Sequence, residues 1–376
     1  MPTPIKRIHA LDALRAIMML LGIVLHSTIT YCVYNQKATW PLADANAQHI
    51  SMDLIMGYIH LFRMPIFFIV AGFFGALLFY ERSAIIMLKN RINRVVWPFV
   101  VFAIILWPII GSIFLFSYTA MTGEILPEST QAFSLTRLIP TKIFHLWFLY
   151  YLIMISAFAF CIGLITNKKT IFKKRIRKMM HGLLVYPFLK IIFSTIAVFA
   201  ILLLMNQTWV GTNITFVPDW KIFLFYCFFY LFGWFLFLER QYLETFKQYD
   251  WLYFFSSIVL FTAAFFLQSS LSFFVQAFLN ALIVVSAFYG IIGLFIRYFS
   301  QPSNKMRYLS DASYWVYLVH LPFTLLGPGL LVNYELPAVI KALIVILITT
   351  FITFTSYHFC VRSTFIGKFL NGKKYP

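Results

Sequence analysis

Charged side chains are scarce in this chain. They make up 11% of its 376 residues, whereas hydrophobic residues make up 61% and aromatic residues 20%. A soluble domain carries about 25% charged residues, so these few charges could not cover a surface that faces water. The composition excludes an ordinary soluble domain and predicts a polytopic integral membrane protein.

Carboxylates are scarcer still, with 12 Asp and Glu residues against 30 Lys and Arg residues. All of them, Asp12 and Asp311 included, lie in loops or near the ends of apolar runs. The chain thus lacks the mid-membrane acids of proton-driven transporters and the paired acids of a glycosidase. It also lacks the GxSxG, Walker A and HExxH motifs. These absences leave histidine and arginine as the groups that could carry chemistry.

Cysteine patterns are missing as well. Cys32, Cys161, Cys227 and Cys360 lie far apart, within or beside apolar runs, and form no CxxC pair. We expect buried thiols and neither a disulfide framework nor a metal site.

Long apolar runs make up most of the sequence. A transmembrane helix needs about 20 such residues, and no loop is long enough for a soluble domain. The first run is too long for the core of a signal peptide, so we expect it to remain as a span. The chain is therefore predicted to be one all-α domain, residues 1–376, with about ten transmembrane helices. The predicted spans are 11–33, 53–80, 95–118, 144–166, 183–205, 220–238, 251–268, 272–296, 312–332 and 337–361.

Three details of these runs carry expectations of their own. Only residues 269–271 separate the seventh and eighth runs, which predicts a tight helical hairpin. Pro187 and Lys190 interrupt the fifth run, which is the least regular. We expect Lys190 and Lys341, near the ends of their runs, to extend toward the membrane interface.

Basic residues alternate between rich and poor loops. If the N-terminus is cytosolic, the far side holds only Lys37, Arg137, Lys142 and Lys221. This is the positive-inside pattern, and it predicts that both termini are cytosolic. Since the basic residues lie between apolar runs and not on a soluble face with stacking aromatics, the net charge of +18 does not indicate binding of nucleic acid.

The most basic stretch is 168–178. Its simpler interpretation is an interfacial segment that is attracted to anionic lipid. The alternative is that it also draws a polyanionic cytosolic ligand, such as a coenzyme A ester.

A few ionisable side chains lie well inside the predicted spans. A charge at mid-bilayer costs about 2.5–3.5 kcal/mol on insertion scales, so such residues usually face the bundle interior and carry function. These side chains are Arg15, His26, His60, Arg63 and His320, with His145 nearer a span end.

Arg15 and His26 share one face of the first span, because 11 residues make three helical turns plus about 20°. They stand ~16.5 Å apart along the axis. A guanidinium suited to phosphate and an imidazole able to move protons thus point toward the same interior. The alternative is an arginine that extends to the cytosol and a histidine that bonds to a neighbouring helix.

The second and ninth spans repeat this pattern. Asp53, His60 and Arg63 fall close to one helical stripe, and Gly72 with Gly75 permits close helix approach. In the ninth span, Ser313, Tyr317 and His320 form another stripe at i, i+4 and i+7. Pro322 and the Gly-Pro-Gly at 327–329 predict that this helix kinks or breaks. A core histidine bonded to Tyr or Ser is the alternative for His320.

A histidine base with arginine anion clamps fits acyl or phosphoryl transfer to a hydroxyl. The residues by themselves do not decide between the two reactions.

Four motifs in a ten-span frame carry a family resemblance. The segment 11–26, with Arg15 and His26 separated by ten residues, resembles the signature of the acyltransferase 3 family of membrane acyltransferases. Residues 62–73, 145–149 and 313–320 support it in the expected order. The chain looks most similar to the branch that succinylates osmoregulated periplasmic glucans. Ala71 is a departure, because the family often has Ser before the glycine.

The resemblance implies a bacterial inner-membrane enzyme with a cytosolic acyl-CoA donor, succinyl-CoA or acetyl-CoA, as co-substrate. It implies no tightly bound cofactor, and a periplasmic glucan or another glycan as the acceptor. We expect Arg15 to hold the donor phosphates, His26 to act as general base or acyl carrier, and Arg63 to stabilise negative charge. The expected catalytic residues are His26, Arg63, Tyr317 and His320, and the expected substrate-binding residues are Arg15, His60, His145 and Trp147.

Other functions stay open at this point. The acceptor could be lipopolysaccharide, capsule or peptidoglycan, with acetyl as the transferred group. A glycan transporter would need alternating access and usually an inverted repeat, which the sequence does not show. A structural scaffold would leave the intramembrane arginines and histidines unexplained.

Overall fold

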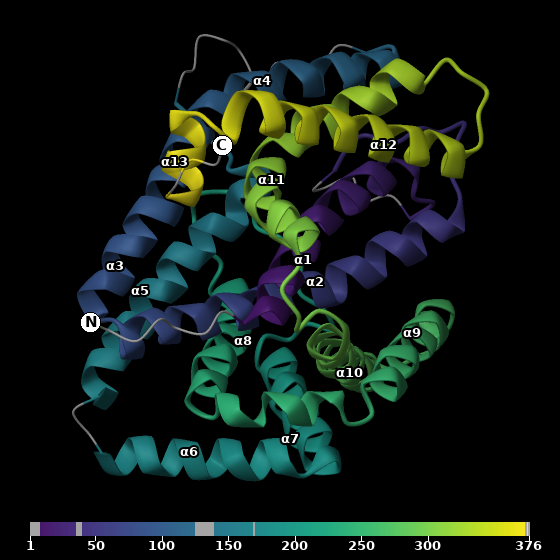
Figure 1. The fold of residues 1–376 in the computed structure, drawn as a ribbon. Coiled ribbons are helices and arrows are strands. Elements are labelled where there is room, and N and C mark those ends of the chain that lie inside the picture. The colour runs from purple at the N-terminus through teal and green to yellow at the C-terminus, as the bar shows by residue number, and fades with distance from the viewer. Residues whose placement is uncertain (1–7, 35–39, 125–138, 168–169, 373, 375–376) are drawn as a thin grey trace.

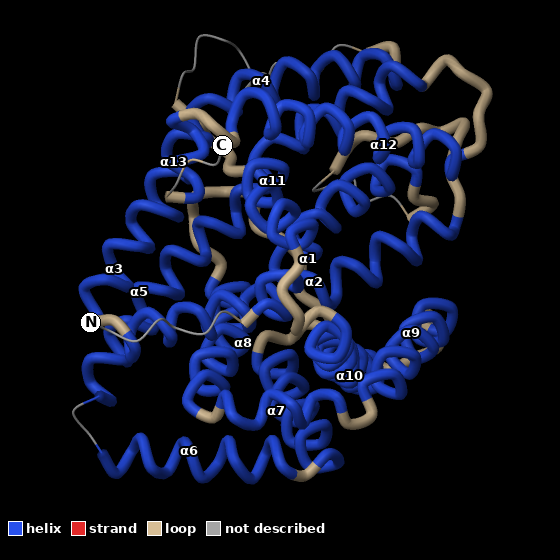
Figure 2. The backbone as a smooth tube through the Cα atoms, viewed as in Figure 1, coloured by secondary structure: helices blue, strands red, loops and turns tan. Residues whose placement is uncertain are grey.

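The computed structural model describes residues 8–34, 40–124, 139–167, 170–372 and 374. These residues form helices joined by loops, and the β pairing among them is one isolated bridge between Lys142 and Thr215 (Figure 2). Ten of the described helical segments are long and apolar enough to cross a bilayer. The prediction of an all-α protein with about ten transmembrane helices is confirmed, and the orientation of the termini stays a prediction.

Figure 1 shows the arrangement of the helices. Those in the ten spans are α1 (His9–Thr28), α2 (Ile50–Glu81), α3 (Ala84–Arg91) continued by α4 (Trp97–Thr122), α5 (Trp147–Asn167), α7 (Pro187–Leu204), α8 (Trp220–Leu238), α9 (Asp250–Leu267), α10 (Phe273–Tyr298), α11 (Asn304–Leu331) and α12 (Ala338–Ser356). The other elements are the short helices η1 (Ile29–Tyr31), η4 (Phe144–Leu146) and η5 (Arg240–Lys247), the π-helical turns Ile92–Val96 and Tyr357–Val361, and the helices α6 (Thr170–Val185) and α13 (Phe365–Asn371).

The helix of the third span begins well before its predicted start at residue 95. Ser83 caps α3 by accepting a hydrogen bond from the amide of Ile86 (3.1 Å). The helix then runs through the π-helical turn Ile92–Val96 into α4. Arg91 and Arg94, which read as loop charges in the sequence, therefore have fixed positions on helical backbone.

The fifth predicted span, 183–205, divides in two. Pro187 takes the first position of α7, where its missing N–H removes no intrahelical bond. The residues before it form the separate helix α6, which lies along the lower edge of the bundle in Figure 1. Most of the basic stretch 168–178 is on α6, and residues 168 and 169 lie outside the described residues.

Helices α1 and α11 pack against each other in the middle of the bundle, and α2 packs on both α1 and α8 (Figure 1). The crossing of α2 and α8 is very close. A Cβ on Gly72 would lie 1.9 Å from the carbonyl oxygen of Tyr230, and one on Gly233 would lie 1.9 Å from that of Ile69. The close approach predicted at Gly72 is confirmed, and it packs α2 tightly against α8.

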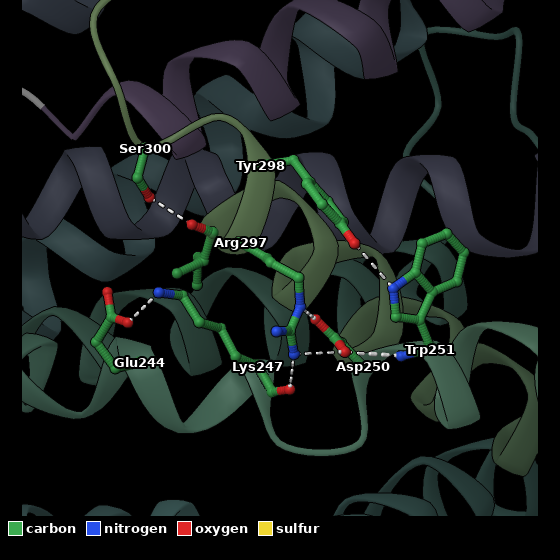
Figure 3. A network of polar contacts seen from close by, with 8 residues as sticks. Glu244, Lys247, Asp250, Trp251, Arg297, Tyr298 and Ser300 are labelled. Carbon is green, nitrogen blue, oxygen red and sulfur yellow. Dashed lines mark hydrogen bonds and ion pairs between the residues drawn. The ribbon is translucent and has the colours of Figure 1, made fainter.

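Helices α9 and α10 form the predicted hairpin, and a polar corner fixes their other ends (Figure 3). Arg297 reaches the carboxylate of Asp250 with Nε (2.7 Å) and Nη2 (3.0 Å), and Nη2 also donates to the carbonyl of Lys247 (2.6 Å). Trp251 donates through Nε1 to the hydroxyl of Tyr298 (3.1 Å). This network ties η5, the start of α9 and the end of α10 together.

Two predictions about single residues are wrong in part. Helix α11 does not break, because it continues through Pro322 and Pro328 to Leu331, and the predicted kink stays a prediction. Cys161 and Cys360 are exposed on the outer faces of their helices, while Cys32 and Cys227 are buried as predicted.

The two lysines near span ends do not extend to an interface. Lys190 is fully buried, and its Nζ donates to the carbonyl of Thr245 (2.9 Å). Lys341 is equally buried and forms an ion pair with Asp44, with 2.7 Å between Nζ and Oδ2. Each ammonium group is bonded to an oxygen inside the protein, so neither side chain extends to the membrane interface.

Candidate active site

A small cavity lies where α1, α2, η4 and α11 meet. Its volume is about 40 Å³. His320 lies behind it, with its ring centroid 5.3 Å from that of His26 and 5.2 Å from that of His145. All predicted site residues except Arg15 therefore come together here. Those that line the cavity are His26, His60, Arg63, His145, Trp147 and Tyr317.

His26 occupies the centre of this group. Its ring stacks on that of Trp40 (5.7 Å between centroids, 26° between planes) and lies at a tilt of 40° to that of His320. Trp40 is held by a hydrogen bond from its Nε1 to Thr30 Oγ1 (3.0 Å). No helical period marked Trp40, because it reaches the site from a loop. Nδ1 of His26 has no hydrogen-bond partner among the described residues.

The other three histidines are each held by a backbone carbonyl. His320 Nδ1 lies 2.7 Å from the carbonyl oxygen of Tyr317, His145 Nε2 lies 3.0 Å from that of Leu318, and His60 Nε2 lies 3.0 Å from that of Val210. A carbonyl can only accept, so each of these nitrogens donates, and the second ring nitrogen of the neutral imidazole is the acceptor. These bonds fix three rings and three tautomers. His26 has no such bond among the described residues, so no hydrogen bond holds its ring in one tautomer.

Arg63 brings a positive charge to the same point. It is 7% exposed, and its Nε donates to the carbonyl of Met18 on α1 (2.8 Å). A Cβ on Gly22 would lie 2.8 Å from Arg63 Nη2 and 3.4 Å from His320 Nε2, so the glycine leaves room for both side chains one turn before His26. No carboxylate pairs with Arg63 among the described residues. A buried cation without a carboxylate partner is costly, which is typical of a site that receives an anion.

Tyr317 and η4 position His145. The hydroxyl of Tyr317 donates to the backbone carbonyl of His145 (2.8 Å). The preceding residue, Phe144, has φ +43°, a left-handed conformation that is rare for an aromatic residue. Strain of this kind gathers at functional sites, and here it turns the chain so that His145 faces His320.

Arg15 lies in a second cavity of about 360 Å³. Its Nη2 donates to Ser310 Oγ (3.2 Å) and lies 3.6 Å from the carboxylate of Asp12. Arg91 and Arg94 line the same cavity. In the sequence they were only two of the basic residues that set the membrane orientation. The third span is helical from Ala84 onward, and this helix brings both arginines to the cavity of Arg15.

The two cavities are neighbours. Phe148 lines both of them. Its ring packs against Phe67 with 4.4 Å between centroids and against Tyr317 with 6.0 Å. A cavity rich in arginine and a cavity rich in histidine thus meet at one aromatic side chain. Among the described residues, no group of three or more His, Cys, Asp or Glu side chains could hold a metal ion.

Comparison with known proteins adds a family and a group of relatives. The family model described as "Acyltransferase domain", of the acyltransferase 3 type, matches residues 8–358. The chain is 30% identical over 155 residues to the glucans biosynthesis protein C of Escherichia coli K12, and equally to that of E. coli O1:K1. The matched segment is 41% of this chain and spans 38% of the length of these relatives. No solved structure matches.

Proposed function

The chain belongs to the acyltransferase 3 family and is a multi-pass membrane acyltransferase, and from this we propose an acyl-CoA-dependent O-acyltransferase of a periplasmic glucan. The acyl group is proposed to be succinyl, and the membrane the bacterial inner membrane. The glucan is suggested by the name of the E. coli relatives. O-acetylation of lipopolysaccharide, capsule or peptidoglycan is the alternative within the same chemistry.

The observation that carries the proposal is the pairing of the two cavities at Phe148. Arg15, Arg91 and Arg94 present guanidinium groups, which suit the phosphates of coenzyme A. The separation of ~16.5 Å along α1 between Arg15 and His26 suits the extended pantetheine arm. The donor would enter from the basic, cytosolic side and bring its thioester past Phe148 to His26.

The proposed reaction uses His26 as general base. His26 takes the proton of a glycan hydroxyl while the hydroxyl oxygen attacks the thioester carbonyl carbon. The C–S bond then breaks, and the coenzyme A thiolate leaves with the proton from the imidazolium of His26. In a two-step variant, a ring nitrogen of His26 attacks the thioester carbonyl carbon, the C–S bond breaks and coenzyme A leaves as the thiol with the imidazole proton. The glycan hydroxyl oxygen then attacks the acyl-imidazole, the N–C bond breaks, and the hydroxyl proton returns to His26.

Arg63 is proposed to stabilise the oxyanion that forms on the carbonyl oxygen. Its guanidinium converges with His320 beside Gly22, one turn from His26, and is fixed by its bond to Met18. His60, His145, Trp147, Tyr317 and His320 are proposed to shape the cavity and hold its polar groups in place.

The test is mass spectrometry of periplasmic glucans from cells with and without the protein. His26→Ala is expected to lower acylation by about 10²–10⁴-fold, the usual contribution of a general base. His181→Ala on α6 is the matched control, because its ring is exposed and packs on Tyr242, away from the site. A succinyl mass increment with the wild type and His181→Ala, lost in His26→Ala, supports donor, acceptor and base together.

Two results count against the proposal. Wild-type acylation by a well-folded His26→Ala protein would remove His26 as the base. Unchanged glucans in the presence of the wild-type protein would remove the glucan as the acceptor and direct the search to other envelope glycans.

A further inference from the structure

A third cavity, of about 290 Å³, opens at the end of the bundle where α2 begins and α9 meets α10. This volume is near the lower end of small-molecule sites, which start at about 300 Å³. Seven of its fourteen lining residues carry an aromatic ring or a side-chain amide. They are Tyr34, Trp209, Phe261, Phe265, Gln268, Gln276 and Asn280.

The aromatic side is ordered by contacts within the protein. Tyr34 packs edge-on against Phe265 (5.8 Å between centroids) and is itself 58% exposed. Asp53 fixes this corner, because its carboxylate accepts from the amides of Val33 (2.8 Å) and Tyr34 (3.0 Å). Tyr34 and Phe265 thus pack ring against ring at the border of an open cavity, which suits stacking against a flat ligand.

The amide side offers hydrogen bonds without charge. Gln276 donates to the carbonyls of Gln268 (2.6 Å) and Leu271 (3.0 Å), and Asn280 donates to that of Thr208 (3.0 Å). The amide oxygens of Gln276 and Asn280 accept no hydrogen bond from the described residues. The charged residue in the lining is Asp53, which is bonded to backbone amides, so the cavity presents no cation to a phosphate.

The cavity adjoins the active site through one loop and one helix. Thr208 and Trp209 line the cavity, the carbonyl of the next residue bonds His60, and Thr212 lines the histidine cavity. The ring of Trp209 lies 4.8 Å from that of His60. On α2, Leu61 lines this cavity while its neighbour His60 lines the other.

We propose that this outer cavity binds the sugar rings of the acceptor glycan and presents a hydroxyl toward His60 and the histidine cavity. Aromatic rings stack on the C–H faces of sugars, and neutral amides bond their hydroxyl groups, so the lining selects a neutral polyhydroxy ligand over an anionic one. The assignment rests on the proposed glycan acyltransferase function. It adds the location of the acceptor and the residues that recognise it.

The test compares two neighbouring phenylalanines on α9. Phe265 lines the cavity, whereas Phe266 is not among its lining residues, is 61% exposed and contacts Phe265 edge-on, with 5.5 Å between the ring centroids. With purified protein in nanodiscs, Phe265→Ala and Gln268→Ala are each expected to raise the KM for a short glucan about tenfold, equivalent to about 1.4 kcal/mol. The KM for acyl-CoA is expected to stay unchanged, and Phe266→Ala is expected to change neither value.

Direct binding of the same glucan, measured by equilibrium dialysis, separates this inference from the proposed function. If the wild type binds glucan and Phe265→Ala weakens binding, the cavity assignment stands even where no acyl transfer is detected. If the wild type acylates glucan while Phe265→Ala and Gln268→Ala keep its KM and affinity, the acceptor binds elsewhere. If the wild type binds no glucan, the cavity is not a glycan site.

Discussion

Replacing Lys341 with methionine would leave the carboxylate of Asp44 buried without its cation. The two side chains are 1% and 0% exposed, with 2.7 Å between Nζ and Oδ2. Removal of one partner of a buried ion pair costs about 3–5 kcal/mol, because an uncompensated charge remains. We expect Lys341→Met to lower the free energy of unfolding by about this amount.

Lys341→Met should also disturb the candidate active site. Asp44 lies in the loop between Trp40 and α2, and its amide donates to the carbonyl of Thr30 (3.1 Å). Thr30 also receives the hydrogen bond from Trp40, the residue that stacks on His26. A loop released from α12 would loosen this stack, so we expect acyl transfer to fall even at temperatures where the protein stays folded.

The test is a double-mutant cycle of Lys341→Met and Asp44→Asn. The apparent melting temperature in detergent and the rate of acyl transfer are measured for each variant. The double variant no longer buries a lone charge, so it should be more stable than Lys341→Met alone, with a coupling of about 2 kcal/mol. Lys305→Met, at an exposed position at the start of α11, is the control and should have little effect. Strictly additive losses, or a fully stable Lys341→Met protein, would refute the reasoning.

Two further predictions concern the donor side. Arg15→Ala is expected to raise the KM for acyl-CoA by about tenfold or more, since a charge-assisted bond contributes roughly 1.5–3 kcal/mol, and to change the acceptor KM little. Isothermal titration with coenzyme A checks this prediction. Unchanged coenzyme A affinity would remove Arg15 from the donor site. Phe148→Trp is expected to narrow the junction of the two cavities and lower kcat more than coenzyme A affinity, whereas equal losses in both would indicate a packing defect.

The transmembrane architecture could be predicted because it depends on local composition. Runs such as 220–238 coincide with helix α8, and the hairpin after α9 follows from the short segment that joins two apolar runs. The early start of the third span could not be predicted in this way. The basic residues of α3 lower its hydropathy, and its start depends on the N-cap at Ser83.

The helical residues that meet at the candidate site were predictable as interior residues for the same reason. His26, Arg63 and His320 stand out because a polar group inside an apolar span is costly. Trp40 and Trp209 could not be found this way, since they come from loops in which aromatic residues carry no positional signal. Arg91 and Arg94 were hidden among residues that also satisfy the positive-inside rule.

The sequence by itself determined the class of protein and the presence of ten spans, and it marked Arg63 and His320 as interior side chains, because the bilayer sorts residues by polarity along each helix. Only the tertiary structure decided which of these side chains meet. Three contacts join residues from separate helices and loops. They are the approach of Arg63 and His320 at Gly22, the ion pair of Asp44 with Lys341, and the position of Phe148 between the two cavities. Such contacts depend on how the helices cross and not on the period of any one of them, so they appear only when the bundle is assembled.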